Sequence, residues 1–203
     1  MTRTPLDGEA IFTITDFLTP EECAQFIAQS EALGFGDAPL AGGEVIKSFR
    51  DNDRATLDDP ALAARLFERA RAFLPSVIEG HELVDFNERW RFYRYGPGQT
   101  FKPHHDGAYH RFRQLQASEL TFLIYLNDDF AGGGTNFFHD LLTHFQFGAG
   151  PWLCVKPVRG TALVFRHRLL HEGAVVESGR KYVLRTDVMY GRPRGVNAAG
   201  RSG

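Results

Sequence analysis

The feature that most constrains the fold is a run of short strand patterns, separated by glycine-rich turns, in the second half of the chain. Tight turns are indicated at Gly96-Pro97-Gly98, Gly132-Gly133-Gly134, Arg159-Gly160 and Ser178-Gly179-Arg180. Many short, evenly spaced strands are typical of a small barrel, sandwich or jelly roll. The eight predicted strands are Arg91–Tyr95, Phe101–Asp106, Leu120–Asn127, Gly134–Phe138, Leu153–Pro157, Thr161–His167, Glu172–Glu177 and Lys181–Tyr190.

Two helices are predicted before these strands. Thr19-Pro20-Glu21-Glu22 combines an N-cap threonine, a proline at the first helical position and a glutamate that completes a capping box. A second helix is expected to open at Asp59-Pro60 and to end before Pro75. Helices that precede a set of strands in this way cover one face of the resulting sheets.

The remaining N-terminal patterns and the chain length suggest a single domain. A strand is predicted at Ala10–Thr15, and Phe49–Arg54 has the composition of a charged loop. A length of 203 residues fits one core. We therefore expect one domain over residues 1–190, with helical support at 1–87 and a jelly-roll core at 88–190. The glycine- and arginine-rich stretch 191–203 is expected to be a disordered tail.

Composition excludes several classes of protein. With 23 basic and 25 acidic side chains the net charge is -2, which argues against nucleic acid as a partner. No apolar run approaches the roughly 18 residues of a membrane span, and the first residues lack a secretory pattern. The two cysteines, Cys23 and Cys154, form neither a disulfide framework nor a zinc motif. A reducing, cytoplasmic location is the expectation.

A His-x-Asp pair stands near the end of one predicted strand. Side chains two positions apart on a strand point to the same side, so His104 and Asp106 could bind one ion while His105 points away. His171 is the preferred third ligand, and His167 competes with it. Two histidines and one carboxylate on one face form the site typical of non-haem Fe(II) oxygenases. The alternative is a set of surface or hydrogen-bonded residues without a metal.

The last predicted strand carries unexpected charge on one of its two faces. Tyr182, Leu184, Thr186 and Val188 share the face that suits a packed core. The opposite face suits a polar cavity inside a barrel, with Lys181 as a candidate partner for a carboxylate, or else a water-facing edge. That face carries Lys181, Val183, Arg185 and Asp187.

These residues lie in a larger pattern. Tyr95-Gly-Pro-Gly-Gln-Thr-Phe101-Lys-Pro-His104-His-Asp106 resembles the Y-x-x-G-x-x-F-x-x-H-x-D signature of the prolyl 4-hydroxylase-like 2-oxoglutarate/Fe(II) oxygenases. The resemblance covers most of the chain in the same order. It continues through Phe17-Leu18-Thr19-Pro20-Glu21-Glu22-Cys23, Ile124-Tyr125-Leu126-Asn127, Gly132-Gly133-Gly134-Thr135-Asn136-Phe137, Pro157-x-x-Gly160-x-Ala162-Leu163-x-Phe165 and His171-Glu-Gly…Gly179-Arg-Lys181.

The resemblance implies a mainly β fold with N-terminal helices (α+β), namely a double-stranded β-helix or cupin-like jelly roll. It implies Fe(II) held by His104, Asp106 and His171, and a 2-oxoglutarate cosubstrate whose far carboxylate pairs with Lys181. It also implies O2 as co-reactant, succinate and CO2 as products, and ascorbate as a candidate stimulant. Three further residues match positions around the cosubstrate: Tyr95 and Tyr125 as hydrogen-bonding groups and Thr135 as a lining residue.

Candidate substrate residues are also implied by the resemblance. Arg50, Asn52 and Arg54 match an Arg-x-Asn-Asp-Arg loop that is expected to close over the site, although most charged loops are only solvated. Phe101 stands where family members touch substrate. Asp187 stands where collagen-type enzymes carry a substrate-contacting tryptophan, and this departure weighs against collagen-like substrates.

Three functional hypotheses follow. The first is a hydroxylase of a protein side chain such as proline; Asp106 stands where related halogenases lack a carboxylate, which favours hydroxylation. The second is a hydroxylase of a free amino acid or other small molecule. The third, from another class, is a non-catalytic cupin-like module that binds a metal or ligand. The apolar stretch Phe138–Trp152 is expected to cap the jelly roll, or else to form a dimer or substrate surface, and His139 and His144 receive no role. Neither the substrate nor the oligomeric state follows from the sequence.

Overall fold

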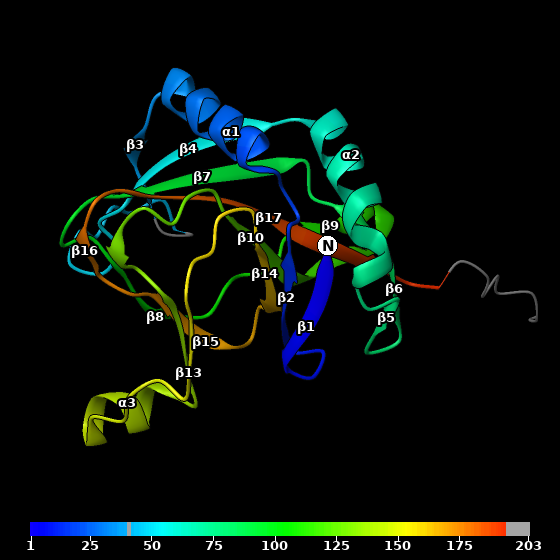
Figure 1. Cartoon of the computed structure of the whole chain (residues 1–203). Coiled ribbons are helices and arrows are strands. Elements are labelled where there is room, and N and C mark those ends of the chain that lie inside the picture. Colours follow the sequence, from blue (N-terminus) through cyan, green and yellow to red (C-terminus); the bar gives the residue numbers. More distant parts are fainter. Residues whose placement is uncertain (40–41, 194–203) are drawn as a thin grey trace, which may run out of the picture.

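The computed structural model describes residues 1–39 and 42–193, apart from the side chains of Thr143, Phe145 and Phe147. Two antiparallel sheets face each other and enclose the centre of the molecule, as Figure 1 shows. The predicted mainly β jelly roll with N-terminal helices is confirmed. No helix in the described part of the chain is long and apolar enough to cross a membrane.

The large sheet runs through the whole molecule and is centred on its longest strand. That strand, β17 (Lys181–Gly191), pairs with β10 (Gln116–Tyr125) along one edge and with β7 (Arg89–Tyr95) and β6 (His81–Phe86) along the other, so it lies in the interior of the sheet. In order, the main path is β1 (Thr2–Asp7), β2 (Ile11–Thr15), β14 (Ala162–Arg166), β10 (Gln116–Tyr125), β17 (Lys181–Gly191), β7 (Arg89–Tyr95), β4 (Asp53–Asp58) and β3 (Gly36–Asp37). Three strands extend it: β5 (Val77–Ile78), β6 (His81–Phe86) and β9 (His110–Arg111).

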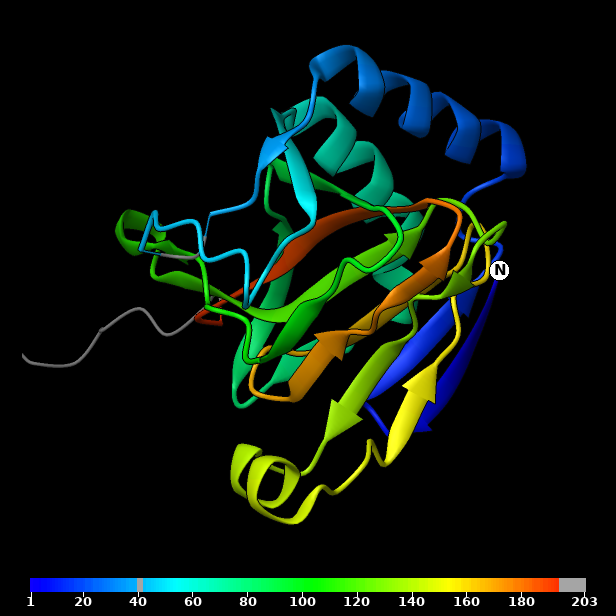
Figure 2. The same ribbon diagram turned by 90° about the vertical axis from the view of Figure 1, so that its left-hand side faces the viewer.

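The small sheet closes the other side of the barrel. Its order is β13 (Leu153–Val155), β12 (Thr135–Phe138), β15 (Leu170–Gly173) and β8 (Phe101–His104). A separate pair is formed by β11 (Ala131–Gly132) and β16 (Val176–Ser178), and two 3-10 turns are η1 (Arg71–Phe73) and η2 (Phe112–Gln114). Figure 2 shows the small sheet in front of the large one.

Two helices cover the outer face of the large sheet (Figure 1). α1 (Pro20–Leu33) begins at the predicted capping box: the Glu22 amide donates to Thr19 Oγ1 at 3.2 Å, and the Thr19 amide donates to Glu22 Oε2 at 3.0 Å. α2 (Pro60–Ala70) begins after Asp59, whose carboxylate accepts from the Leu62 amide at 2.9 Å. Both helix starts were predictable because capping is a local interaction.

The hydrophobic core has two layers separated by the large sheet. The outer layer lies between the sheet and the helices and contains Phe122, Trp90 and Leu66, none of which is exposed to solvent. The inner layer fills the space between the two sheets with Phe137 and Phe165, among others. Each strand of the large sheet contributes to both layers because its side chains alternate between the faces.

Some predicted elements differ from the observed ones. The predicted strand Glu172–Glu177 is two strands, β15 and β16, because the ladder with β8 shifts register between His171 and Gly173 and the chain then crosses to β11. Asp53 and Arg54, expected in a loop, begin β4. Seven strands were not predicted: β1, β3, β4, β5, β6, β9 and β11. Four of them, β3, β5, β9 and β11, have only two residues, which is too short for a periodic pattern.

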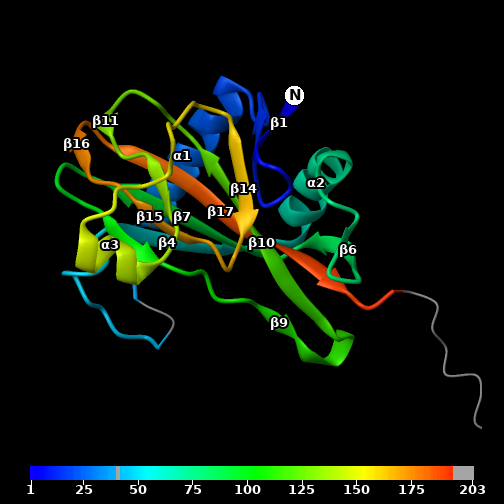
Figure 3. The same ribbon diagram turned by 90° about the horizontal axis from the view of Figure 1, so that it is seen from below.

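α3 (Leu141–Phe147) lies on the hairpin between β12 and β13 and projects from the body of the molecule (Figures 1 and 3). Leu141 and Leu142 are exposed, so they do not cap the barrel as expected. Gly191 is the last residue of β17, and the expectation of a disordered tail otherwise falls on residues 194–203, which lie outside the described part of the chain.

Phe122 provides a test of the outer core layer. Its ring lies 4.9 Å from Phe17 and 4.7 Å from Phe86, between centroids, and it is fully buried. Phe122→Ala should lower the free energy of unfolding in urea by about 3–5 kcal/mol, because it leaves a cavity between the helices and the sheet. Phe112→Ala, at a ring that is 80% exposed, is the matched control and should change it by less than about 0.5 kcal/mol. Similar losses in both variants would contradict this description of the core.

Candidate active site

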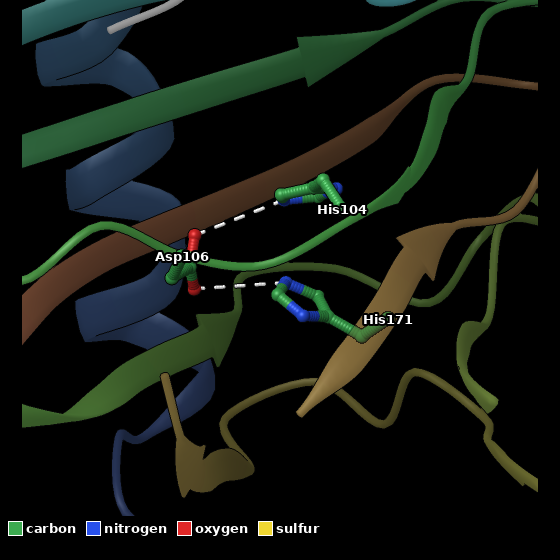
Figure 4. Close-up of side chains that lie close together, drawn as sticks. All are labelled: His104, Asp106 and His171. Atoms are coloured by element: carbon green, nitrogen blue, oxygen red, sulfur yellow. Dashed lines mark ion pairs between the residues drawn. The ribbon is translucent and has the colours of Figure 1, made fainter. Parts of the chain in front are cut away.

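The strand pairing of the small sheet brings together three potential metal ligands. His104 of β8 lies directly opposite His171 of β15, and Asp106 follows β8 by two residues. One ligand atom from each of the three lies within 4.8 Å of the others. Asp106 Oδ1 is 3.7 Å from His104 Nε2, and Asp106 Oδ2 is 3.6 Å from His171 Nε2, as Figure 4 shows.

Both imidazoles are oriented by their second nitrogen. His104 Nδ1 is 2.8 Å from the Lys102 carbonyl oxygen, and His171 Nδ1 is 2.9 Å from the Leu169 carbonyl oxygen. A carbonyl only accepts, so each Nδ1 carries the proton and donates it. Each Nε2 therefore presents a lone pair toward Asp106. Metal-binding histidines are commonly fixed in this way, by a hydrogen bond from the ring nitrogen that does not bind the metal.

The protonation states of the three groups suit a divalent cation. Burial lowers the pKa of His104 to about 3 and also lowers the pKa of His171, so both rings are neutral. Burial by itself would raise the pKa of Asp106, but Arg185 and the two histidines outweigh it and hold that pKa well below its usual range. Two neutral imidazole nitrogens and one carboxylate fit the facial ligand set of non-haem Fe(II).

Aromatic rings hold the two histidines in place. The Phe101 ring stacks on His104 with 3.5 Å between centroids, and Phe165 meets His171 edge-on at 4.5 Å. Because these rings are apolar, they limit the rotation of the imidazoles without competing for their nitrogen atoms.

A buried polar network stands behind Asp106. Thr121 Oγ1 donates to Asp106 Oδ2 at 2.5 Å, and Arg185 Nη2 lies 3.1 Å from the same oxygen. His167 is hydrogen-bonded through Nδ1 to Thr121 at 3.0 Å and through Nε2 to Ser118 at 2.8 Å. His167, the competing ligand in the sequence, is thus placed behind Asp106 and not in the ligand cluster.

An inner cavity extends from the ligand cluster between the two sheets. Lys181 lies in its wall, 2% exposed, and its Nζ donates to the Gly133 carbonyl at 2.6 Å. The Nζ also lies 5.0 Å from the centre of the Tyr95 ring and 5.8 Å from that of Tyr125. Among the described residues Lys181 makes no ion pair, and burial lowers its pKa to about 7.

This ammonium group tests whether the cavity fits the implied cosubstrate. A buried charge without a counter-ion is costly, so the site favours a ligand that brings a carboxylate. The register of β17 and β7 pairs Lys181 with Tyr95, which also lines the cavity. Tyr125 Oη lies 2.7 Å from Thr135 Oγ1, so one of these two hydroxyls donates to the other. The proton of the second hydroxyl is left for a ligand. A dicarboxylic keto acid fits the residues present.

An outer cavity opens on the same ligand cluster, and most of the candidate substrate residues line it. Arg50, Arg54, Phe101 and Asp187 line it. Asn52 is fully buried, and its Oδ1 accepts from Arg50 Nε at 2.9 Å, so it orients Arg50. Asp187 accepts from Arg91 at 3.1 Å and from Arg185 at 3.1 Å.

Sequence reasoning assigned no role to several residues of the site. Arg185 and Arg91 could have been found, because each shares a strand face with an assigned residue, Lys181 and Tyr95 respectively. Tyr93 could have been found in the same way. Thr121 carries no comparable signal, since a threonine inside a strand usually packs or bonds locally.

Residues 90–186 match the family model of the 2OG-Fe(II) oxygenase superfamily, and this range contains the three potential metal ligands and Lys181. Prolyl 4-hydroxylase 1 of Arabidopsis thaliana is 29% identical over 200 residues, which cover 85% of this chain and 66% of the plant protein, just under two thirds of its length.

Solved structures show the same fold. The viral collagen prolyl hydroxylase of Paramecium Bursaria Chlorella virus-1, in complex with 2OG, has a TM-score of 0.60 at 22% identity and covers 93% of this chain and 99% of its own. A prolyl hydroxylase of Trichoplax adhaerens, in complex with a hypoxia inducible factor peptide fragment, has a TM-score of 0.66 at 16% identity, covering 90% and 84%. The two facing sheets are therefore a double-stranded β-helix.

The family match, the fold and the His104–Asp106–His171 cluster agree with one another. Residues 90–186 match the 2OG-Fe(II) oxygenase superfamily, and the chain as a whole is similar to enzymes of the prolyl 4-hydroxylase type.

Proposed function

We propose that this protein is an Fe(II)- and 2-oxoglutarate-dependent dioxygenase. Its substrate is an unactivated C–H bond of a protein side chain, with proline as the first candidate. The observation that carries the proposal is the position of a facial His-Asp-His set and an unpaired buried ammonium in one cavity. A second support is that a structural relative is solved with a bound peptide fragment. One atom of O2 would enter the substrate as hydroxyl and the other would enter succinate, with release of CO2.

The metal would be held by His104 Nε2, His171 Nε2 and the carboxylate of Asp106. When bound, iron with its keto acid supplies the oxidising chemistry that no side chain can supply. The protein keeps Asp106 ionised and oriented through Thr121 and Arg185. It keeps both rings neutral through burial, which leaves their Nε2 atoms available.

The cosubstrate would lie in the inner cavity with its far carboxylate on Lys181. Tyr95 lines this space, and Tyr125 lies behind it, bonded to the lining residue Thr135. Burial raises the pKa of both phenols, so both stay protonated. Leu123, Val183 and Phe165 complete the wall. This apolar lining excludes water from the reacting centre and strengthens the ion pair at Lys181.

The two other hypotheses make different demands on this site. A hydroxylase of a free amino acid would use the same iron and cosubstrate residues and differ only in the outer cavity. A non-catalytic cupin-like module would not need an unpaired buried Lys181, which is costly to keep without an anion.

Metal and cosubstrate binding can be tested together without substrate. Anaerobic addition of Fe(II) and 2-oxoglutarate should give a weak visible charge-transfer band, which Asp106→Ala should abolish because one of three ligands is lost. Asp7→Ala, which removes an exposed carboxylate on β1, is the control and should keep the band. Absence of the band in the unaltered protein would favour the binding-module hypothesis.

Lys181 predicts a pH dependence of cosubstrate affinity. The carboxylate binds the ammonium form, and that form is lost as the pH rises through about 7. The Kd for 2-oxoglutarate should therefore rise by up to about tenfold per pH unit above this pKa, and stay nearly constant below it. Lys181→Met should raise the Kd by about 10- to 100-fold at neutral pH and remove the pH dependence. Titration calorimetry between about pH 6 and about pH 9 measures both effects; a Kd that is unaffected by the substitution would exclude the ion pair.

The protein-substrate hypothesis can be tested on a proteome. Lysate from a strain that lacks this protein should, on treatment with the loaded enzyme, yield peptides that gain one oxygen atom on proline. Enzyme with Asp106→Ala, which lacks a metal ligand, is the matched control. Mass spectrometry that finds no such gain in any peptide would favour a small-molecule substrate.

A further inference from the structure

The outer cavity carries an excess of positive charge that the proposed chemistry does not use. It lies on the far side of the ligand cluster from Lys181 and shares Phe101, Tyr93 and Arg185 with the inner cavity. The charged side chains that line it are four arginines against two aspartates: Arg50, Arg54, Arg91, Arg185, Asp106 and Asp187.

The charges of a loaded inner site cancel and leave this excess in place. A divalent iron and the two carboxylates of 2-oxoglutarate offset each other, as do Lys181 and Asp106. Asp187 is then the one carboxylate that faces four guanidinium groups of the outer cavity, and it is already shared by Arg91 and Arg185. Arg50 and Arg54 make no ion pair within the described part of the chain.

Arg50 is held in a position where one edge of its guanidinium has no partner. The residue is 6% exposed, and its guanidinium carbon lies 4.4 Å from the centre of the Phe101 ring and 4.7 Å from that of Tyr93. Its Nε donates to Asn52, but its buried Nη2 has no hydrogen-bond partner among the residues that the structure describes. A buried donor without an acceptor is costly, so this group favours a bound acceptor.

Arg54 lies beside Arg50 on the same wall. It comes from β4, opposite Tyr93 of β7, and within the described chain its Nη1 has one hydrogen-bond partner, the Pro39 carbonyl at 3.4 Å. Burial lowers the pKa of Arg54, and so do the neighbouring guanidiniums of Arg50 and Arg91. Positive charges forced together in a partly buried place favour an anion between them.

The pKa of Tyr93 is shifted by the same positive charges. Burial would raise the pKa of its phenol, but Arg185, Arg50 and Arg91 outweigh burial and lower that pKa to about 8. The phenol thus experiences a strongly positive surrounding, as any substrate group placed there would.

We propose that the outer cavity binds a carboxylate of the substrate, through Arg54 and Arg50, beside the C–H bond that is hydroxylated. This inference rests on the proposed hydroxylase function and narrows its substrate class. A planar carboxylate matches the paired donors of a guanidinium. The carboxylate can belong to an acidic residue next to the target in a peptide, or to a free amino acid.

The test compares charged and neutral probes that are otherwise alike. Short labelled peptides carry one central proline flanked by glutamates in one member of the pair and by glutamines in the other. Fluorescence anisotropy measures their affinity for protein loaded with Fe(II) and 2-oxoglutarate under anaerobic conditions. Wild type should bind the glutamate peptide at least about tenfold more tightly than the glutamine peptide. Arg54→Gln should remove that preference and change the affinity for the glutamine peptide by less than about twofold.

Two further variants separate binding from folding. Arg65→Gln removes an exposed arginine from α2, on the opposite side of the large sheet, and should leave both affinities unchanged. Arg54→Lys keeps the charge and should retain part of the preference. Equal binding of the two peptides by wild type, or equal weakening of both by Arg54→Gln, would overturn the carboxylate site.

The products and a second pair of probes distinguish the two proposals. A glutamate peptide that binds through Arg54 but gains no oxygen in air would support the carboxylate site and contradict prolyl hydroxylation. If neither peptide binds, L-proline and L-prolinamide take their place in calorimetry. Arg54-dependent binding of the acid over the amide then supports the carboxylate site with a free amino acid as its source, and binding of neither, or of both alike, overturns it.

Discussion

The alternation of side chains along β17 is the constraint on which the rest of the structure depends. This strand is paired along both edges, and the helices cover one of its faces while the small sheet covers the other, so most of its side chains are buried. Tyr182, Leu184 and Val188 join the layer under the helices, and the intervening positions turn into the barrel. A strand period of two therefore places the ammonium of Lys181, the guanidinium of Arg185 and the carboxylate of Asp187 on one face of the strand, with Val183 between the first two. A shift of one residue in register would send all of them into the apolar layer, where they would have no partners.

The barrel tolerates these charges in two different ways. Arg185 and Asp187 are compensated within the protein, since Asp106, Arg91 and Asn87 lie within hydrogen-bonding distance of one or the other. Among the residues that the structure describes, Lys181 contacts a carbonyl oxygen and two aromatic rings, and Arg50 contacts an amide oxygen and two aromatic rings; neither forms an ion pair there. Uncompensated buried charge costs stability, and it is retained where a ligand brings the opposite charge. The compensated groups hold the metal ligands, and the uncompensated ones face the two places where small molecules or side chains would bind.

Much of the fold could be predicted because its signals are local. The capping box at Thr19 and the cap at Asp59 need only neighbouring residues, and the helices begin where these residues place them. Most of the predicted strands exist with boundaries shifted by a few residues. The strand expected at Glu172–Glu177 is divided because a register shift after His171 depends on β8, a partner about seventy residues earlier in the chain. The apolar stretch around α3 was expected to cover the barrel, but exposed Leu141 and Leu142 show that an apolar pattern alone does not determine what it packs against.

By itself, the sequence determined the identity of the reactive groups: a His-x-Asp pair, a later histidine and a lysine on a strand face, in the order of a known family. Only the tertiary structure decided between His171 and His167, because both histidines stand at strand ends and the choice depends on which one pairs with β8. It also decided that Asn52 orients Arg50 and that four arginines from separate strands and a loop surround one space. The physical reason is that ligand and charge clusters depend on distances between strands, which register and sheet order set, whereas spacing along the chain reports only the face on which each side chain lies.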